Sequence, residues 1–174
     1  MDIDYKHKIV NREQLAEIVR KARETGKKIV FTNGVFDLLH VGHVRYLHWA
    51  RSRGDMLIVA INSDASARRL KGPKRPIVPQ DERAEMLAAL AFVDYVIIFD
   101  EDTPDNILRI VRPDVHVKGG DYRPEELPEA PLVKSLGGEI QIAPHVDGKS
   151  TTITIARIVE RYFDEARQGQ GKNE

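Results

Sequence analysis

The stretch FTNGVFDLLHVGHVRYLHWA, residues 31–50, joins an apolar strand to a helix through a loop that contains glycine. It continues the run KKIVFT, which is typical of a short buried strand. The helix is expected from about Val41 to Arg53, with Gly54 at its end. A strand followed directly by a helix is the repeating unit of proteins built on a parallel sheet. The stretch therefore predicts a fold of the α/β class.

The rest of the chain repeats this alternation. A helix is expected within residues 11–26, where apolar side chains recur at helical spacing. Further strands are expected at 56–61, 95–99, 114–118 and 139–143, and further helices at 63–70, 80–92, 104–111 and 150–166. Thr103 and Pro104 form the expected cap and first residue of the helix over 104–111. The pattern predicts an α/β fold, a doubly wound parallel sheet with helices on both faces.

Composition narrows the classes of function. The 174 residues fit one domain, expected over residues 1–166, with a polar tail over 167–174 that is expected to be disordered. Lys plus Arg equals Asp plus Glu, 27 each, so neither nucleic acid nor a membrane surface is expected as a partner. The absence of cysteine excludes disulfides, thiolate zinc sites and cysteine nucleophiles. No signal peptide or membrane-spanning run is recognisable, and a cytoplasmic protein is expected.

Four polar or glycine-rich segments follow the expected strands. They are the loop within 31–50, then NSD at 62–64, KGGDY at 118–122 and HVDGKSTT at 145–152. In open parallel sheets, ligands bind beyond the carboxyl ends of the strands. We therefore expect these segments to converge on one crevice.

His40 and His43 are the clearest candidates for chemistry. Residues three apart share a face of a helix, and Gly42 between them allows a ligand to approach the backbone. A helix N-terminus favours anions, so the two imidazoles could donate hydrogen bonds to a phosphate as its charge develops. Two alternatives remain open: each histidine could be a cap or a buried structural group, and a metal pair is weak without a carboxylate partner.

GKSTT, residues 148–152, offers a second phosphate-binding pattern at the start of a helix. A simple N-cap by Ser150 would explain the same residues, and the segment does not match a Walker A loop. Among the basic residues, Lys71 lies in a Gly/Pro-rich loop, while Arg83 opens a helix, where a cation opposes the helix dipole. Both could serve a ligand, or belong to a solvated basic loop. In KGGDY, a turn alone would explain the two glycines.

Together these motifs resemble a known family. GVFDLLHVGH with the later GKSTT resembles the HxGH and STT signature pair of the cytidylyltransferase-like nucleotidyltransferases. Over about residues 8–162 the chain resembles, within them, the D-glycero-β-D-manno-heptose 1-phosphate adenylyltransferases, which serve ADP-heptose formation for the lipopolysaccharide core. In many members this domain follows a sugar kinase, and the chain resembles the stand-alone form. Val35 departs from the pattern, where cysteine is common, and no arginine precedes the STT motif, which favours a heptose over a glycerol substrate.

The resemblance implies a Rossmann-like nucleotidyltransferase fold. It also implies attack by a sugar-phosphate oxygen on the α-phosphate of ATP, with release of pyrophosphate and with Mg²⁺ bound to the triphosphate. His40, His43, Lys71 and Arg83 are the implied catalytic residues, with Lys71 and Arg83 bridging the two substrates. The implied nucleotide-binding residues are Asn33, Gly34, Val35, Phe36, Asp37, Gly42, Lys118, Gly119, Asp121, Gly148, Ser150, Thr151 and Thr152, and Asn62, Asp64 and Lys71 are the implied substrate-binding residues.

The partners implied are ATP, a sugar 1-phosphate and a second copy of the chain in a homodimer. Three rival functions stay open. One is a cytidylyltransferase for glycerol 3-phosphate or another polyol phosphate. The second is an adenylyltransferase of the pantetheine-phosphate kind, whose usual second motif differs from GKSTT. The third is a nucleotide-binding module without catalysis, although both histidines and the hydroxyl triplet are intact.

Overall fold

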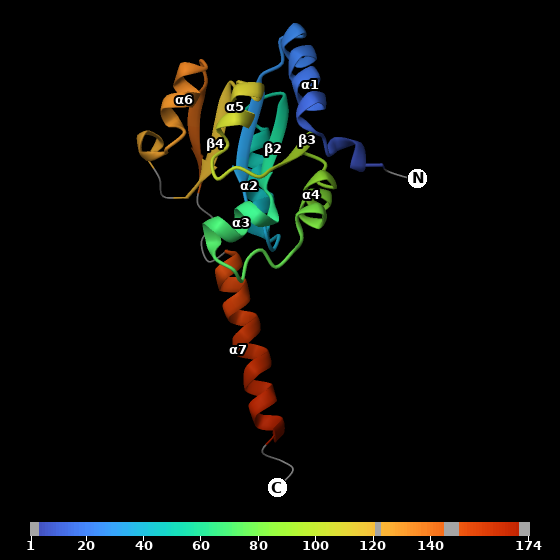
Figure 1. The fold of residues 1–174 in the computed structure, drawn as a ribbon, viewed down its shortest axis with the longest axis vertical. Coiled ribbons are helices and arrows are strands. Elements are labelled where there is room, and N and C mark those ends of the chain that lie inside the picture. The colour runs from blue at the N-terminus through green and yellow to red at the C-terminus, as the bar shows by residue number, and fades with distance from the viewer. Residues whose placement is uncertain (1–3, 121–122, 145–149, 171–174) are drawn as a thin grey trace.

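A five-stranded parallel sheet organises the chain in the computed structural model, which describes residues 4–120, 123–144 and 150–170 (Figure 1). Its strands are β1 (Ile29–Gly34), β2 (Met56–Asn62), β3 (Tyr95–Phe99), β4 (Val115–Gly119) and β5 (Glu139–Ala143), in the order β3-β2-β1-β4-β5. The chain thus builds outward from β1 to β3, then returns to the other side of β1. This confirms the doubly wound α/β fold and places the switch point between β1 and β4.

Helices cover both faces of the sheet. The helical elements are η1 (Lys6–Lys8), α1 (Arg12–Glu24), α2 (Val41–Arg51), α3 (Asp64–Lys71), α4 (Gln80–Ala88), α5 (Asp105–Val111), η2 (Pro124–Glu126), α6 (Ala130–Ser135) and α7 (Thr151–Gln170). Side chains from α1, α5 and α6 share one buried cluster with alternate residues of the strands, and side chains from α2 and α4 share the other. Because successive strand side chains point to opposite faces, a continuously apolar strand such as β2 serves both clusters.

Helix ends show where sequence patterns succeed and fail. Asn11 caps α1 through a capping box with Gln14, inside the range expected for this helix. The expected cap at Thr103 is wrong: Pro104 is the N-cap residue of α5 and makes no side-chain cap hydrogen bond. Helix α4 ends at Ala88 instead of reaching residue 92, because a turn brings the chain back to β3.

The C-terminal helix differs from the expectation in length. Helix α7 continues to Gln170, beyond the expected end at residue 166, and residues 171–174 lie outside the described part. It extends away from the sheet and its covering helices (Figure 1). Ile155, Ile158, Val159 and Tyr162 follow helical spacing along it, and Tyr162 is 67% exposed. In the described residues, no helix combines the length and the apolar character that crossing a membrane requires.

Strands β1 and β4 stop pairing with each other near the carboxyl end of β1. The pairing of β1 with β2 runs to Gly34, but its pairing with β4 is limited to Val30 with Val115 and Phe31 with His116. Tyr46, on α2, bridges the gap beyond that point. Its hydroxyl donates to the Val117 carbonyl at 2.9 Å and lies 2.5 Å from the Thr32 hydroxyl. The separation opens the crevice that a switch point offers to ligands.

Candidate active site

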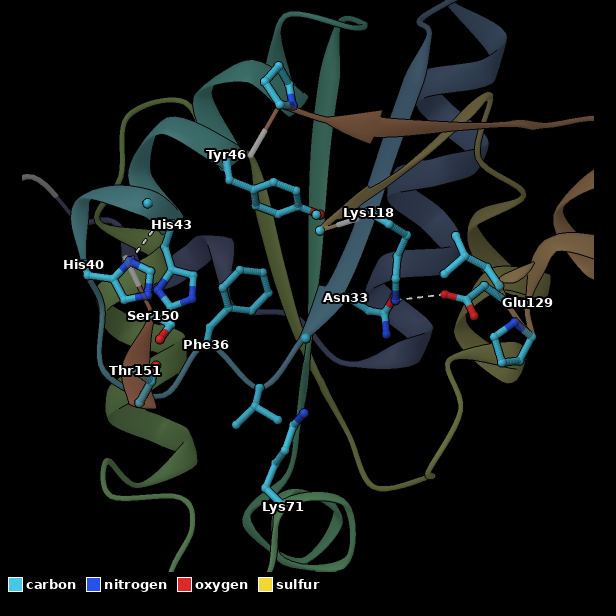
Figure 2. A pocket seen from close by; sticks show the side chains of 18 residues that line it. Asn33, Phe36, His40, His43, Tyr46, Lys71, Lys118, Glu129, Ser150 and Thr151 are labelled. Atoms are coloured by element: carbon cyan, nitrogen blue, oxygen red, sulfur yellow. Dashed lines mark hydrogen bonds and ion pairs between the residues drawn. The ribbon is translucent and has the colours of Figure 1, made fainter. Parts of the chain in front are cut away.

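A cavity of about 820 Å³ lies at the carboxyl ends of β1 and β4 (Figure 2). That volume lies within the usual range of ligand-binding pockets. The described lining residues are Asn33, Gly34, Val35, Phe36, His40, Gly42, His43, Tyr46, Lys71, Lys118, Gly119, Gly120, Leu127, Pro128, Glu129, Pro144, Ser150 and Thr151. The loop after β1, the end of β4 and the start of α7 therefore meet here, as the sequence predicts, whereas the fourth expected segment, residues 62–64, is not among the described lining residues. Asp121 and Gly148 lie outside the described residues.

His40 takes the capping role that the sequence left open as one alternative, and it also lines the cavity. It is the N-cap residue of α2, where its Nδ1 accepts a hydrogen bond from the His43 backbone N–H at 3.4 Å. With Nδ1 accepting, a neutral His40 ring carries its hydrogen on Nε2. Since His40 also lines the cavity, the cap fixes which ring nitrogen can act as a donor there.

His43 stacks on His40, with ring centroids 3.8 Å apart and an interplanar angle of 17°. Its other neighbour is the edge of Phe36, at a centroid distance of 5.3 Å. Burial, followed by the nearby His40, lowers the pKa of His43 to about 4. The ring is therefore neutral near pH 7, and a bound phosphate would favour its protonated form.

Acid should destabilise the protein before its carboxylates titrate. The folded-state pKa of His43 lies below its ordinary value of 6.5, so its contribution is complete above that pH and is lost as the pH falls towards 4. Burial, followed by the charge of Lys118, lowers the pKa of His116 in the same direction. We expect the free energy of unfolding to fall by roughly 2 kcal/mol between about pH 6.5 and pH 4.5 from His43 alone. Urea unfolding at several pH values measures this. A His43→Gln variant with an equally steep loss would contradict it.

The loop after β1 has a demanding geometry. Phe36 adopts a left-handed backbone conformation, with φ of 47°, and its ring lies over Gly34, where a Cβ atom would come within 3.1 Å of it. Asp37 is buried and accepts hydrogen bonds from the Ile77 and Val78 N–H groups and from Arg75. Burial raises the pKa of Asp37, but these donors outweigh it and hold the pKa below its ordinary value. Asp37 thus shapes the loop and is not among the described residues of the cavity lining.

Ser150 and Thr151 bring the start of α7 to the cavity. The Ser150 hydroxyl accepts from the Ile153 N–H at 3.1 Å, which is the capping contact that the sequence left open as an alternative. Thr152 is exposed and is not among the described lining residues. The N-terminal ends of α2 and α7 thus both border the cavity, and each favours an anion there.

Arg83 does not take the position expected of a substrate-bridging cation. It is 0% exposed, and its guanidinium donates to the Val78 carbonyl at 2.9 Å, the Val35 carbonyl at 2.5 Å and Asp64 at 2.8 Å. This corrects the expectation that Arg83 contacts substrate, because protein acceptors engage all three of its donor nitrogens. Asp64 is its ion-pair partner, and buried Asn62 donates to the Ser66 hydroxyl. Arg83, Asp64 and Asn62 are not among the described residues that line the cavity. Lys71 is exposed and does line it.

Sequence reasoning missed Glu129, which lines the cavity beside the expected residues Asn33 and Lys118. Glu129 pairs with Lys118 at 2.8 Å, and Lys118 also donates to the side-chain oxygen of Asn33 at 3.2 Å. Figure 2 shows these three side chains on the opposite side of the cavity from His40, His43 and Ser150. Glu129 comes from the segment RPEELPEAP, which has neither helical nor strand periodicity and therefore gave no signal.

Comparisons with known proteins agree with this geometry. Residues 31–157 match the family described as cytidylyltransferase-like. Similar curated proteins include the bifunctional protein HldE of Trichlorobacter lovleyi, 54% identical over 162 residues, and that of Geobacter metallireducens, 54% identical over 158 residues. These matches cover 93% and 91% of this chain but 33% and 32% of the relatives, so the chain spans about a third of their length.

A solved structure is also similar. It is described as the lipopolysaccharide core biosynthesis protein from Thermoplasma volcanium, and it superposes with a TM-score of 0.61 at 31% sequence identity. The match covers 70% of this chain and 100% of the other.

Proposed function

Because the chain belongs to the cytidylyltransferase-like family, we propose that it is a nucleotidyltransferase that joins ATP and a sugar 1-phosphate, with release of pyrophosphate. The observation that carries this proposal is the position of the histidine pair. His40 and His43 stand at the N-terminal end of α2 and share one cavity with the N-terminal end of α7. Two such ends with two imidazoles suit a chain of phosphates.

The sugar phosphate that we propose is D-glycero-β-D-manno-heptose 1-phosphate, which gives ADP-heptose. Three observations support it. The motifs over residues 8–162 resemble the heptose 1-phosphate adenylyltransferases, curated relatives at about half identity carry the name HldE, and a structural neighbour is described as a lipopolysaccharide core biosynthesis protein.

The reaction needs positioning and charge stabilisation more than covalent chemistry. An oxygen of the sugar phosphate attacks the α-phosphorus of ATP as the bond to pyrophosphate breaks. His40 and His43 donate hydrogen bonds to the α-phosphate oxygens, whose negative charge grows in the transition state. Ser150, Thr151 and the adjacent backbone N–H groups hold the β- and γ-phosphates, and Lys71 bridges the two substrates.

Mg²⁺ bound to the triphosphate would neutralise part of its charge. Within the residues described by the structure, no three His, Asp or Glu side chains are placed to hold a metal ion. A cation held mainly by substrate phosphates fits such a site, because Mg²⁺ keeps several of its waters and needs few protein ligands.

Pyrophosphate release tests the proposed function directly. The protein is supplied with Mg²⁺ and with ATP or CTP, each paired with heptose 1-phosphate or glycerol 3-phosphate. Release with ATP and the heptose alone is the expected result. Release with CTP and glycerol 3-phosphate would keep the reaction and overturn the substrates, and release with no pair would contradict the proposal.

We also propose that two copies of the chain associate through α7. The apolar residues Ile155, Ile158, Val159 and Tyr162 leave that helix with an uncovered face in the described structure. An isolated helix is marginally stable in water, so packing of its apolar face would stabilise it. Light scattering should give about twice the chain mass of 19.7 kDa, and a mass of one chain would contradict the dimer.

A further inference from the structure

The cavity has two chemically different ends (Figure 2). One end carries His40, His43, Ser150 and Thr151. The other carries Asn33, Lys118 and Glu129, and Glu129 is the one carboxylate among the described lining residues. The cation at this second end, Lys118, is paired with the Glu129 carboxylate, so a phosphate placed there would gain no net electrostatic attraction.

Lys118 offers no unpaired positive charge to an anion. Its ammonium group pairs with Glu129 at 2.8 Å, and the two side chains are 19% and 8% exposed. The pair as a whole is neutral, and both side chains are largely buried at the cavity wall. Although burial raises the pKa of Glu129, the hydrogen bond and charge of Lys118 hold it below its ordinary value, so the carboxylate is ionised. This end of the cavity therefore suits a neutral, polar group that can donate hydrogen bonds to a carboxylate.

Asn33 supplies the complementary donor. Its side-chain oxygen lies 3.2 Å from Lys118 Nζ and 3.2 Å from His116 Nε2. Because an ammonium group can only donate, the Asn33 oxygen must face Lys118. The Asn33 amide nitrogen has no acceptor among the described residues and remains available as a donor. A buried, neutral His116 holds this orientation from behind, packed edge-on against Phe31.

We propose that Asn33, Lys118 and Glu129 form a subsite for the adjacent hydroxyls of a sugar ring. Each hydroxyl both donates and accepts, so a pair of them can give hydrogen bonds to the Glu129 carboxylate and receive one from the Asn33 amide. The proposal rests on the proposed function, since that function brings two sugar-bearing molecules into this cavity. The ring is either the ribose of the nucleotide or the sugar of the sugar phosphate.

The decisive variant is Glu129→Gln, which keeps the size of the side chain and removes its charge. A charge-assisted hydrogen bond contributes enough that KM for the substrate bound there should rise roughly 10-fold or more. The KM of the other substrate and kcat should change much less. Asn33→Ala, which leaves the Lys118–Glu129 pair in place, should raise the same KM. Glu125→Gln is the matched control, because Glu125 is exposed in η2 and is not among the described lining residues.

The source of the ring is identified by comparing ATP with 2′-deoxy-ATP and 3′-deoxy-ATP. If ribose binds here, KM of the unsubstituted protein should be higher for a deoxynucleotide than for ATP. In Glu129→Gln the two KM values should be similar. If the sugar phosphate binds here, only the KM of heptose 1-phosphate rises. Unchanged KM values for both substrates, or an equal effect of Glu125→Gln, would overturn the subsite.

Binding measured without turnover separates this proposal from the function on which it rests. Calorimetric titration of ATP and of heptose 1-phosphate gives a Kd for each. A weaker Kd in Glu129→Gln with no pyrophosphate release by the unsubstituted protein would support the subsite and reject the proposed reaction. Pyrophosphate release with unchanged Kd values in Glu129→Gln would reject the subsite and leave the reaction standing.

Discussion

Replacing His40 by asparagine should lower kcat for pyrophosphate release by roughly 100- to 1000-fold, the usual effect of removing one donor from a developing oxyanion. The substitution is chosen because asparagine is a favoured N-cap residue. It can replace the capping contact that His40 Nδ1 makes with the His43 N–H. The free energy of unfolding should therefore stay close to that of the unsubstituted protein, while the donor at Nε2 is lost. Steady-state kinetics and urea unfolding of the same preparation measure the two effects.

His40→Ala and His48→Ala complete the comparison. His40→Ala removes both the donor and the cap, so it should show the same loss of kcat and an additional loss of about 1 kcal/mol in stability. His48 lies on the same helix, exposed and edge-on against Phe92, and its substitution should leave kcat unchanged. If His40→Asn kept full activity, His40 would be a helix cap and no more, and the transition-state role would be wrong.

Replacing Arg83 by methionine should destabilise the fold by about 3 kcal/mol or more, because removing one partner of a buried ion pair leaves the others without their hydrogen bonds. Arg83 holds three segments together: Val35 in the loop after β1, Asp64 at the start of α3, and Val78 before α4. Methionine keeps much of the side-chain volume, so a cavity contributes little to the loss. The free energy of unfolding from urea titration measures the effect.

Arg69→Met is the matched control for this prediction. Arg69 also forms an ion pair, with Asp102, but its side chain is 45% exposed. Exposed pairs of this kind contribute at most about 1 kcal/mol. A stable Arg83→Met protein with kcat or KM changed a hundredfold would restore the substrate contact expected from the sequence.

The sequence predicted the sheet well because its strands are short, continuous apolar runs separated by helical patterns. It also predicted that His40 and His43 would lie together at the crevice, since their spacing and the glycine between them are local features of the sequence. Its error at Arg83 has a different origin. A cation that opposes a helix dipole can be explained by a ligand or by protein acceptors, and the Val35 carbonyl that accepts from Arg83 lies 48 positions away.

Glu129 was missed for a related reason: its contacts are made with residues distant in the sequence. Glu129 pairs with Lys118, and Lys118 contacts Asn33 because β1 and β4 are neighbours in the sheet. Helix α6 was missed as well, since its six residues are too few to show a helical period. Polar side chains that are brought together by neighbouring strands have no fixed sequence separation. Their contacts therefore cannot be predicted from sequence spacing and are found only in the folded structure.

The limited pairing of β1 with β4 has a consequence for the order of folding. Asn33 and Lys118 are 85 positions apart, whereas β1, α2 and β2 follow one another directly. Closing so long a loop costs conformational entropy before any contact rewards it, so contacts of this kind form slowly. We therefore expect the histidine motif to reach its local conformation early, within a β1–α2–β2 unit, and the cavity to appear only when β4 docks. During synthesis, a nascent chain that already includes His40 and His43 but not yet β4 would therefore lack the complete cavity.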